Sequence, residues 1–298
     1  MTWQQASGLA AVAAGAMHRG ARARMAKSAS APATRDRAPE SSTGRRAESG
    51  RLVSVLERCP LLTGLERCEV EEIAALCRFQ PFPAQTDIFI EGQACDGLWV
   101  LASGRVRLYH SAADGRQHVV SFRGESSPLE LGSALDGRAY TATATALEDC
   151  VLVYVPKAVL SHLARNYPVT VRNTIEQLCL ELRQRDIATA VATLKDARGR
   201  IGCTLLQLAR QYGQRLPDGV RIGFRLTRQD IADRSGVTIE TAIRVLSDLQ
   251  RQGVLRTQAQ VIDILDADRL QHPTNCGVCQ FDCSVFGPAV FRGAANLL

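Results

Sequence analysis

The chain has 298 residues, of which 46% are hydrophobic, and this length suits two modest domains joined by a linker. It contains no run of eighteen apolar residues, so the sequence predicts no membrane-spanning helix. The net charge is +6, but the segment up to Arg51 holds nine basic and three acidic residues and accounts for all of it. The remainder is neutral overall, so the basic isoelectric point says nothing about a nucleic-acid-binding face.

The first segment, residues 1–51, is a basic tail rich in Ala, Ser, Arg and Gly. It lacks a sustained periodic apolar face, which predicts disorder. Ten cysteines in a chain without a convincing export signal indicate a reducing cytoplasm, where they are thiols or metal ligands. We therefore expect a cytoplasmic protein.

Residues 52–166 are predicted to form a β-roll or jelly-roll sensor domain with flanking helices. Short helical patterns come first, and after Pro83 the sequence changes to short apolar or alternating runs separated by glycine-containing turns. These strand-like runs lie at 88–90, 98–101, 106–109, 119–122, 139–146 and 150–155. Regular short strands of this kind are typical of a β-roll, within a fold class that is α+β overall.

Residues 167–196 are predicted to form one long helix that pairs with a copy of itself. Its apolar and small side chains recur at a spacing of three and four residues, as in a coiled-coil seam. The seam residues are Ile175, Leu178, Cys179, Leu182, Thr189 and Ala192. Arg185 and Asp186 interrupt the seam. In one interpretation Arg185 pairs with Asp186 of the other copy. In the other, two symmetry-related Arg185 side chains repel each other and weaken the dimer until a signal compensates.

Between Leu226 and Leu255 the sequence predicts a helix-turn-helix. Thr227 and Asp230 form a capping box at the start of the first helix. Gly236 breaks that helix and Thr238 begins a second one, which ends near Gly253. A short strand at 222–226 and two apolar runs at 254–255 and 261–265 predict a β-wing, so residues 197–270 form a winged helix-turn-helix.

The second helix has two different faces. Ala242, Val245, Leu246 and Leu249 recur at helical spacing and form a core stripe. The opposite face carries the residues that a base edge would meet in a major groove, namely Glu240, Ile243, Arg244 and Ser247. Seven arginines against four acidic residues between 221 and 256 concentrate positive charge at this unit.

A glycine-rich β-roll, a long dimer-type helix and a C-terminal winged helix-turn-helix resemble, in that order, the Crp/Fnr family of bacterial transcription regulators. The resemblance covers residues 52 to about 270. It implies that Thr227, Arg228 and Gln229 grip DNA phosphates and that the helix beginning at Thr238 reads bases. In that helix the pattern Glu240, Thr241, Arg244 implies Glu240 as acceptor for a cytosine amino group and Arg244 as donor to guanine.

The family resemblance also implies partners. These are a pseudo-palindromic double-stranded DNA site and a second copy of the chain, and RNA polymerase is a further candidate. Ile243 departs from the small residue usual at its position, which suits contact with a thymine methyl but leaves the half-site open.

The cyclic-nucleotide branch of the family carries a Gly-Glu-Leu segment followed by an Arg-Ser pair that holds the cyclic phosphate. Here the first stretch reads Pro128 to Gly132, the Arg-Ser position falls near Tyr140-Thr141, and Arg138 is displaced from it. Without that arginine a buried cyclic phosphate lacks its bidentate partner, which disfavours cyclic AMP.

The tail, residues 271–298, carries Cys276, Cys279 and Cys283, a spacing that suits a metal or cluster. The Fnr branch implies a [4Fe–4S] cluster, usually on N-terminal cysteines, but no cysteine precedes Cys59. A zinc site, a thiol–disulfide switch and no ligand are the alternatives. The fourth cluster ligand is open among a carboxylate and four cysteines: Cys59, Cys68, Cys77 and Cys95.

The sequence thus predicts a DNA-binding transcription regulator, not an enzyme, that responds to oxygen, nitric oxide or redox state through the tail. One alternative is a regulator gated by a small molecule or haem in the β-roll, with His110, His118 and His162 as polar groups. Another is a regulator that has lost its ligand and binds DNA constitutively. A cupin-like metal enzyme is a distant alternative, because the His-x-His spacing of cupins is missing from the roll.

Overall fold

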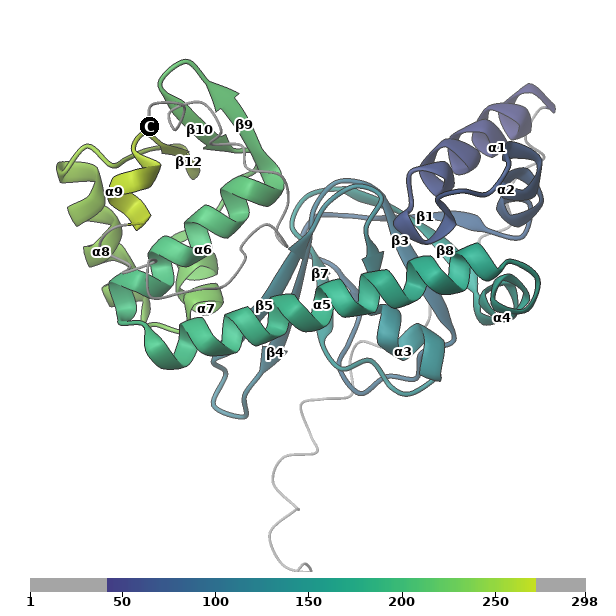
Figure 1. Cartoon of the computed structure of the whole chain (residues 1–298), viewed down its shortest axis with the longest axis horizontal. Helices are drawn as coiled ribbons and strands as arrows, with labels where there is room; N and C mark the ends of the chain where they lie inside the picture. The colour runs from purple at the N-terminus through teal and green to yellow at the C-terminus, as the bar shows by residue number, and fades with distance from the viewer. Residues whose placement is uncertain (1–41, 272–298) are drawn as a thin grey trace, which may run out of the picture. The chain divides into compact units, whose positions relative to one another are not determined.

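The structure, a computed structural model, describes residues 42–271 (Figure 1). It confirms the predicted α+β class, with a β-roll, a long helix and a winged helix-turn-helix following one another along the chain. Within these residues, no helix combines the length and apolar character needed to span a bilayer.

The β-roll consists of two antiparallel four-stranded sheets. One has the order β1-β8-β3-β6 and the other the order β2-β7-β4-β5. The strands are β1 (Arg78–Phe82), β2 (Asp87–Phe89), β3 (Gly97–Ser103), β4 (Val106–Ser111), β5 (Gln117–Arg123), β6 (Pro128–Leu129), β7 (Thr143–Ala146) and β8 (Cys150–Pro156). The run expected at 139–146 is a strand only from Thr143 onward.

The turn between β3 and β4 requires glycine. Gly104 has φ +95°, and a Cβ there would lie 2.6 Å from the Cys150 Sγ and 2.9 Å from the Asp149 carbonyl oxygen. Only a residue without a side chain fits so close to β8 in this conformation. The glycine therefore allows β3 to pass directly into β4, from one sheet to the other.

Short helices flank the roll. They are α1 (Ser42–Glu57), the 3-10 turn η1 (Pro60–Leu62), α2 (Arg67–Ala74), α3 (Leu131–Asp136) and α4 (Lys157–Asn166). Helix α1 begins inside the segment 1–51 for which composition predicts disorder. Its buried side chains, Leu52, Val53, Val55 and Leu56, anchor the helix to the roll, and the helix extends from them toward the N-terminus.

Helix α5 (Pro168–Leu194) is the long helix predicted at 167–196 (Figure 1). Near its start the Asn173 amide donates to the carbonyl oxygens of Leu61, at 3.2 Å, and Thr63, at 2.7 Å. Further along, Arg123 on β5 forms a mostly buried ion pair of 2.8 Å with Glu181. These contacts fix α5 against the roll.

The C-terminal domain contains four helices and one sheet of order β11-β12-β10-β9. Its elements are α6 (Ala197–Tyr212), β9 (Gly213–Leu216), β10 (Gly219–Ile222), α7 (Arg228–Ser235), α8 (Ile239–Arg251), β11 (Leu255–Gln258), β12 (Val261–Ile264) and α9 (Ala267–Gln271). The helix-turn-helix and the wing are thus present where the sequence predicts them.

The strand predicted at 222–226 was wrong. Leu216 pairs with Gly219 across a two-residue turn at Pro217 and Asp218, so the hairpin β9–β10 ends at Ile222. Beyond it the backbone leaves the sheet, and the Leu226 N–H donates to the carbonyl oxygen of Gln260 at the wing turn. The tight turn sets the register and places the strand earlier than its apolar residues suggest.

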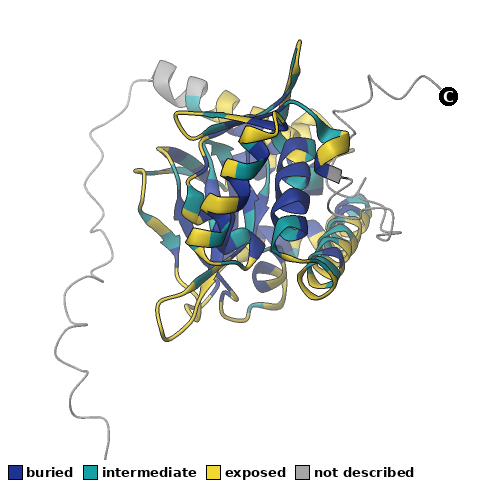
Figure 2. Ribbon diagram, turned by 90° about the vertical axis from the view of Figure 1, so that its left-hand side faces the viewer, coloured by how far each residue is buried: buried dark blue, intermediate teal, exposed yellow. Residues whose placement is uncertain are grey.

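Buried residues fill two hydrophobic clusters, visible as the dark interior in Figure 2. One lies inside the roll and under α1, α2 and α4. The other is the core of the C-terminal domain, and it includes Tyr109, Val119 and Phe122 from β4 and β5. The β4–β5 hairpin therefore contributes to the core beneath the helix-turn-helix.

Candidate nucleic-acid interface

Helix α7 begins with the predicted capping box. The Asp230 N–H donates to the Thr227 Oγ1 at 3.0 Å, and the Thr227 N–H donates to the Asp230 carboxylate at 2.9 Å. The two side chains satisfy backbone groups that the first turn of a helix leaves free. Gly236 ends the helix with φ +60°, as its position predicts.

The same carboxylate is held from the β-roll. Arg107 on β4 donates to the Asp230 Oδ1 at 3.3 Å, while the Oδ2 accepts the Thr227 hydroxyl at 2.6 Å. The side chains of Arg107 and Asp230 are only 16% and 8% exposed. A mostly buried ion pair thus joins the sensor domain to the first turn of α7.

Helix α8 presents the residues expected to meet DNA bases. Thr238 caps it, with its Oγ1 accepting the Thr241 N–H at 3.3 Å. Ala242, Val245, Leu246 and Leu249 are buried as predicted. The residues expected to reach DNA from this helix are exposed (Thr238, Glu240, Ile243, Arg244 and Ser247) or half-buried (Thr241).

Glu240 is suited to accept a hydrogen bond. Its own backbone N–H and the Thr238 hydroxyl lower the pKa of its carboxyl group. The side chain is therefore an anion at neutral pH, which is the state that accepts from a cytosine amino group.

The turn between the two helices is fixed from behind. Arg200 on α6 donates to the Gly236 carbonyl oxygen at 3.1 Å, and the Ser235 hydroxyl donates to the Thr204 hydroxyl at 3.0 Å. The angle between α7 and α8 thus depends on α6, and the sequence of the helix-turn-helix itself does not reveal this.

The three residues expected to grip phosphates lie at the start of α7. Thr227 and Gln229 are exposed and Arg228 is half-buried, which lowers the pKa of its guanidinium. The Gln229 amide donates to the Asp233 Oδ1 at 2.6 Å. Gln229 must therefore exchange this contact or donate its second N–H when it meets a phosphate.

The local excess of arginine is smaller than the sequence count suggests. Arg221 and Arg256 both bind the buried carboxylate of Asp263, and Arg251 pairs with Asp248. Arg225, Arg228 and Arg244 have no such partner among the residues the structure describes. Arg225, which is exposed just before α7, is a further candidate for contact with DNA. The sequence did not identify it, because which arginines pair with carboxylates depends on distance in space and not on spacing along the chain.

The stretch near which the family's phosphate-holding pair is expected, Tyr140-Thr141, carries no arginine of its own. The Glu130 Oε2 instead accepts the Thr141 hydroxyl at 2.7 Å and the Ser133 hydroxyl at 3.2 Å. Tyr140 is 5% exposed and stacks on Phe89 with ring centroids 3.8 Å apart. Burial raises the pKa of Tyr140, so this side chain offers a neutral hydroxyl and no cation.

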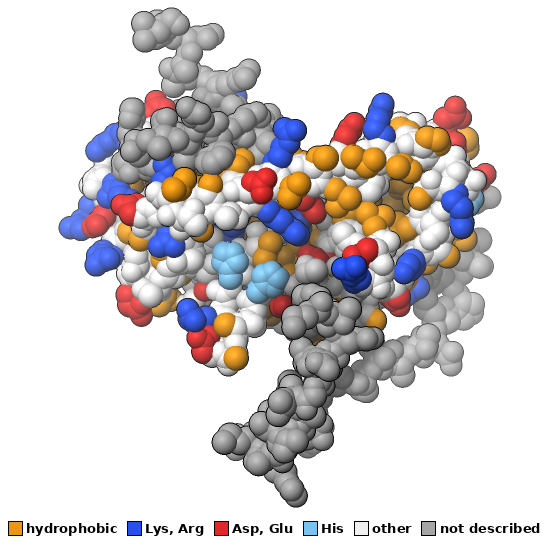
Figure 3. Space-filling view, turned by 60° about the horizontal axis from the view of Figure 1, so that its bottom comes forward, with side chains coloured by type: hydrophobic (Ala, Val, Ile, Leu, Met, Phe, Trp, Pro, Cys, Tyr) orange, Lys and Arg blue, Asp and Glu red, His pale blue; other side chains and the backbone are white. Residues whose placement is uncertain are grey.

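The three histidines of the roll do not converge on one site. His110 contacts the Glu91 carboxylate at 3.3 Å, and His162 contacts Asn166 on α4. Figure 3 shows two histidine side chains next to each other, as the cross-strand pairing of His110 with His118 requires. His118 points to the C-terminal domain, with its Nδ1 3.1 Å from the Asp233 carbonyl oxygen.

His118 makes this contact sensitive to pH. Burial lowers its pKa, the charge of Arg234 and the neighbouring His110 lower it further, and Asp233 opposes them. The unfolded chain, with an ordinary histidine pKa of about 6.5, binds the proton first, so stability falls as pH drops below about 6.5. We expect the melting temperature to fall less between pH 7.5 and 5.5 in His118→Gln than in wild type, whereas His162→Gln behaves like wild type.

The predicted dimer seam lies on an open face of α5. Ile175 and Leu182 are 55% and 61% exposed, and Arg185 and Thr189 are exposed too. Leu178 is partly buried and packs against the roll core. Ile175, Leu182, Thr189 and the interrupting Arg185 are thus free to meet a second copy.

The cysteines of the tail, Cys276, Cys279 and Cys283, lie outside the described residues. Within residues 42–271 no three His, Cys, Asp or Glu side chains gather as a metal site would need. Cys59 is buried and its pKa is raised to about 11, while burial raises that of Cys77 to about 12. A raised pKa keeps the thiol protonated and opposes metal binding.

The remaining two candidate ligands differ in access. Cys95 is buried and its thiol donates to the Gly97 carbonyl oxygen at 3.2 Å. Cys68 at the start of α2 is exposed. Of the four candidates, Cys68 is the one that is exposed, while Cys77 is partly buried.

Two family models match the chain in the order of its domains. The model of the cyclic nucleotide-binding domain matches residues 79–167, and that of the Crp-like helix-turn-helix domain matches residues 199–272. These ranges contain the roll from β1 to α4 and the C-terminal domain from α6 to α9.

Two curated relatives illustrate the likeness. The nitrogen fixation regulation protein FixK of Azorhizobium caulinodans is 32% identical over 184 residues, which cover 61% of this chain and 73% of that protein. The CRP-like cAMP-activated global transcriptional regulator of Mycobacterium tuberculosis (strain ATCC 25618 / H37Rv) is 26% identical over 216 residues, which cover 72% of this chain and 96% of that protein.

Solved structures share the fold. FixK2 from Bradyrhizobium japonicum aligns with a TM-score of 0.60 and 24% identity, covering 66% of this chain and 96% of that one. A mutant of CooA from Carboxydothermus hydrogenoformans aligns with a TM-score of 0.61 and 22% identity, covering 74% and 95%. The identity to the FixK regulator, together with both domain matches, shows that the chain belongs to the Crp/Fnr family of transcription regulators.

Proposed function

We propose that this regulator binds a pseudo-palindromic DNA site as a homodimer and reads each half-site through Glu240 and Arg244. The observation that carries the proposal is the division of α8 into a buried stripe and an exposed face that bears an anionic acceptor and an unpaired arginine. In the major groove these two side chains match the donor of cytosine and the acceptors of guanine.

Phosphate contacts would position the helix. Thr227, Arg228 and Gln229 flank the start of α7, where helix N–H groups also favour an anion. Exposed Arg225 lies next to them and adds a cation. Changing Arg225 should weaken binding to all sequences alike, because phosphates carry no sequence information.

The dimer is proposed to form along α5. If symmetry-related Arg185 side chains repel each other, Arg185→Leu will remove the repulsion and add apolar surface, so we expect dimerisation to strengthen without a signal. Sedimentation velocity measures this directly. Arg183→Leu is the control, since Arg183 is exposed on the same helix but lies outside the seam. Unchanged sedimentation of Arg185→Leu would contradict the repulsion, and weaker dimerisation would favour the alternative, a pair between Arg185 and Asp186 of the other copy.

The signal is proposed to be oxygen, nitric oxide or redox state, sensed at the cysteine tail. Support comes from the roll, where Tyr140 stands in place of a phosphate-binding arginine and the Glu130 carboxylate is already occupied by Thr141. These features disfavour cyclic AMP. The three tail cysteines would hold a [4Fe–4S] cluster, which would supply redox chemistry, and exposed Cys68 is the preferred fourth ligand.

Anaerobic purification tests the sensor. We expect a brown protein with bound iron and sulfide that bleaches in air. Its affinity for DNA should change when the cluster is lost. Cys279→Ala should lose both the colour and the response, and Cys68→Ala should make the colour more labile. Cys179→Ser is the control, because it replaces an exposed cysteine outside the candidate ligands. Because Cys179 lies in the predicted dimer seam, sedimentation velocity verifies that this variant assembles like wild type. A colourless, iron-free wild type would instead favour an effector in the roll.

A further inference from the structure

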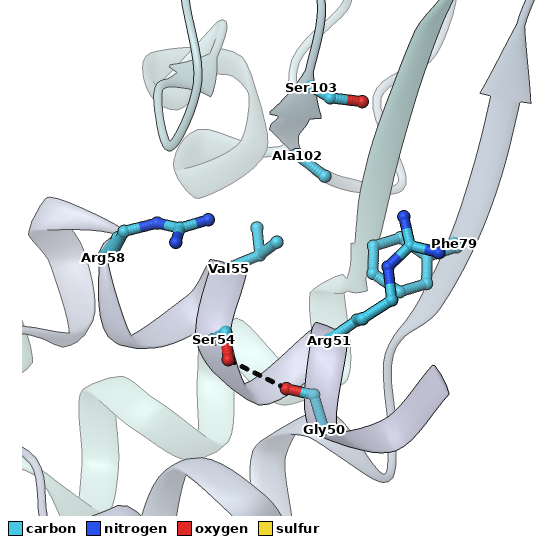
Figure 4. A pocket seen from close by; sticks show the side chains of 8 residues that line it. All are labelled: Gly50, Arg51, Ser54, Val55, Arg58, Phe79, Ala102 and Ser103. Atoms are coloured by element: carbon cyan, nitrogen blue, oxygen red, sulfur yellow. Dashed lines mark hydrogen bonds between the residues drawn. The ribbon is translucent and has the colours of Figure 1, made fainter. Parts of the chain in front are cut away.

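A cavity of about 340 Å³ lies on the outer side of the β-roll, between α1 and the sheet that contains β1 and β3 (Figure 4). The residues that matter in its lining are Arg51, Ser54, Val55, Arg58, Phe79 and Ser103. Glu130 and Tyr140, at the family's cyclic-nucleotide position, are not part of it. Its size is that of a small-molecule site.

One face of α1 forms one wall of the cavity. Arg51, Ser54 and Val55 lie at i, i+3 and i+4 on one side of the helix, and Arg58 follows in the turn after it. Leu52, Val55 and Leu56 are buried in the roll core and fix the helix. Arg51, Ser54 and Arg58 are exposed and border the cavity.

The two arginines in this wall lack carboxylate partners. Within residues 42–271, neither Arg51 nor Arg58 forms an ion pair. The acid beside them, Glu57, points to Arg67, with its Oε1 3.5 Å from the Arg67 Nη1. Two positive charges without an ion-pair partner in the described part of the chain thus border one cavity, which favours a negatively charged occupant.

The cavity also has an apolar side. Val55 is buried, and the Arg51 guanidinium lies over the Phe79 ring at 5.5 Å from its centroid. Figure 4 shows the Arg58 side chain extended toward the side of the cavity where Val55 lies. The pairing of β3 with β8 is irregular between Leu101 and Ser103, where the strand borders the cavity. An irregular register re-aims side chains at the end of a strand.

We propose that this cavity is a second effector site, which takes a small organic anion with a phosphate or carboxylate group and a planar apolar body. Arg58 binds the oxyanion, since a guanidinium donates two parallel hydrogen bonds to such a group. The planar apolar part of the ligand lies against Val55 and against the Phe79 ring, which the Arg51 guanidinium covers. None of the described lining residues belongs to the helix-turn-helix.

Calorimetric titration of the full chain with phenyl phosphate tests this assignment, and benzoate serves as the carboxylate counterpart. We expect saturable binding and a dissociation constant at least tenfold higher in Arg58→Gln, because one charge-assisted contact is lost. Arg116→Gln, which removes an arginine on the turn after β4, should bind like wild type. Arg58 is exposed and unpaired, so its substitution leaves the fold intact, which a melting curve verifies.

The remaining outcomes decide the chemistry of the ligand. Stronger binding of phenyl phosphate than of benzoate identifies a phosphate ligand, and the reverse order a carboxylate. Equal affinity for inorganic phosphate and phenyl phosphate would show that the apolar side of the cavity adds no binding energy. In that case Phe79→Leu should leave the dissociation constant unchanged. No heat at millimolar probe, or equal affinities in Arg58→Gln and Arg116→Gln, would overturn the proposal.

Discussion

Arg244→Ala is expected to weaken binding to the cognate DNA site by about 1–3 kcal/mol for each half-site, which is the value of one bidentate contact to guanine. Arg244 is exposed on α8 and its removal leaves the buried stripe of that helix untouched. The melting temperature should therefore stay constant while affinity falls. Fluorescence anisotropy with labelled duplexes at fixed salt measures the change.

The control for this experiment is Arg251→Ala. Arg251 lies in the last turn of α8 and pairs with Asp248, so it shares the helix but not the reading face. Loss of discrimination at a single base pair is the signature of Arg244 as a reading residue. An equal loss on cognate and scrambled duplexes would show instead that Arg244 contacts phosphate.

Arg107→Met should destabilise the protein by about 3 kcal/mol, because it leaves a buried carboxylate without its cation. The pair between Arg107 and Asp230 is mostly buried, and the substitution keeps an apolar stem of similar length. Asp230 also caps α7, so the loss should loosen the first turn of the helix-turn-helix. Chemical denaturation, with amide exchange in residues 227–231, reports both effects.

A double-mutant cycle with Asp230→Asn isolates the pair from the cap. The coupling free energy should exceed 1 kcal/mol if the ion pair itself is stabilising. Arg116→Met is the matched control, since its pair with Asp114 is exposed and exposed pairs contribute about 0–1 kcal/mol. Additive effects of Arg107→Met and Asp230→Asn would mean that the two domains are not coupled through this contact.

Local patterns predicted the helix-turn-helix well. Thr227, Asp230 and Gly236 act within their own turns, and the stripe containing Ala242 and Leu246 depends only on helical periodicity. The register of the hairpin β9–β10 was missed because a two-residue turn overrode the apolar run that follows it. Helix α1 was under-predicted because its support comes from the roll and not from its own sequence.

The sequence by itself determined the order of the domains and the two faces of α8, since each depends on residue type and short spacing. Only the tertiary structure decided which arginines are free, because Asp263 neutralises Arg221 and Arg256 across strands. It also joined Arg107 to Asp230 over 123 residues. Charge pairing and burial depend on distance in space, and a linear pattern does not encode that distance.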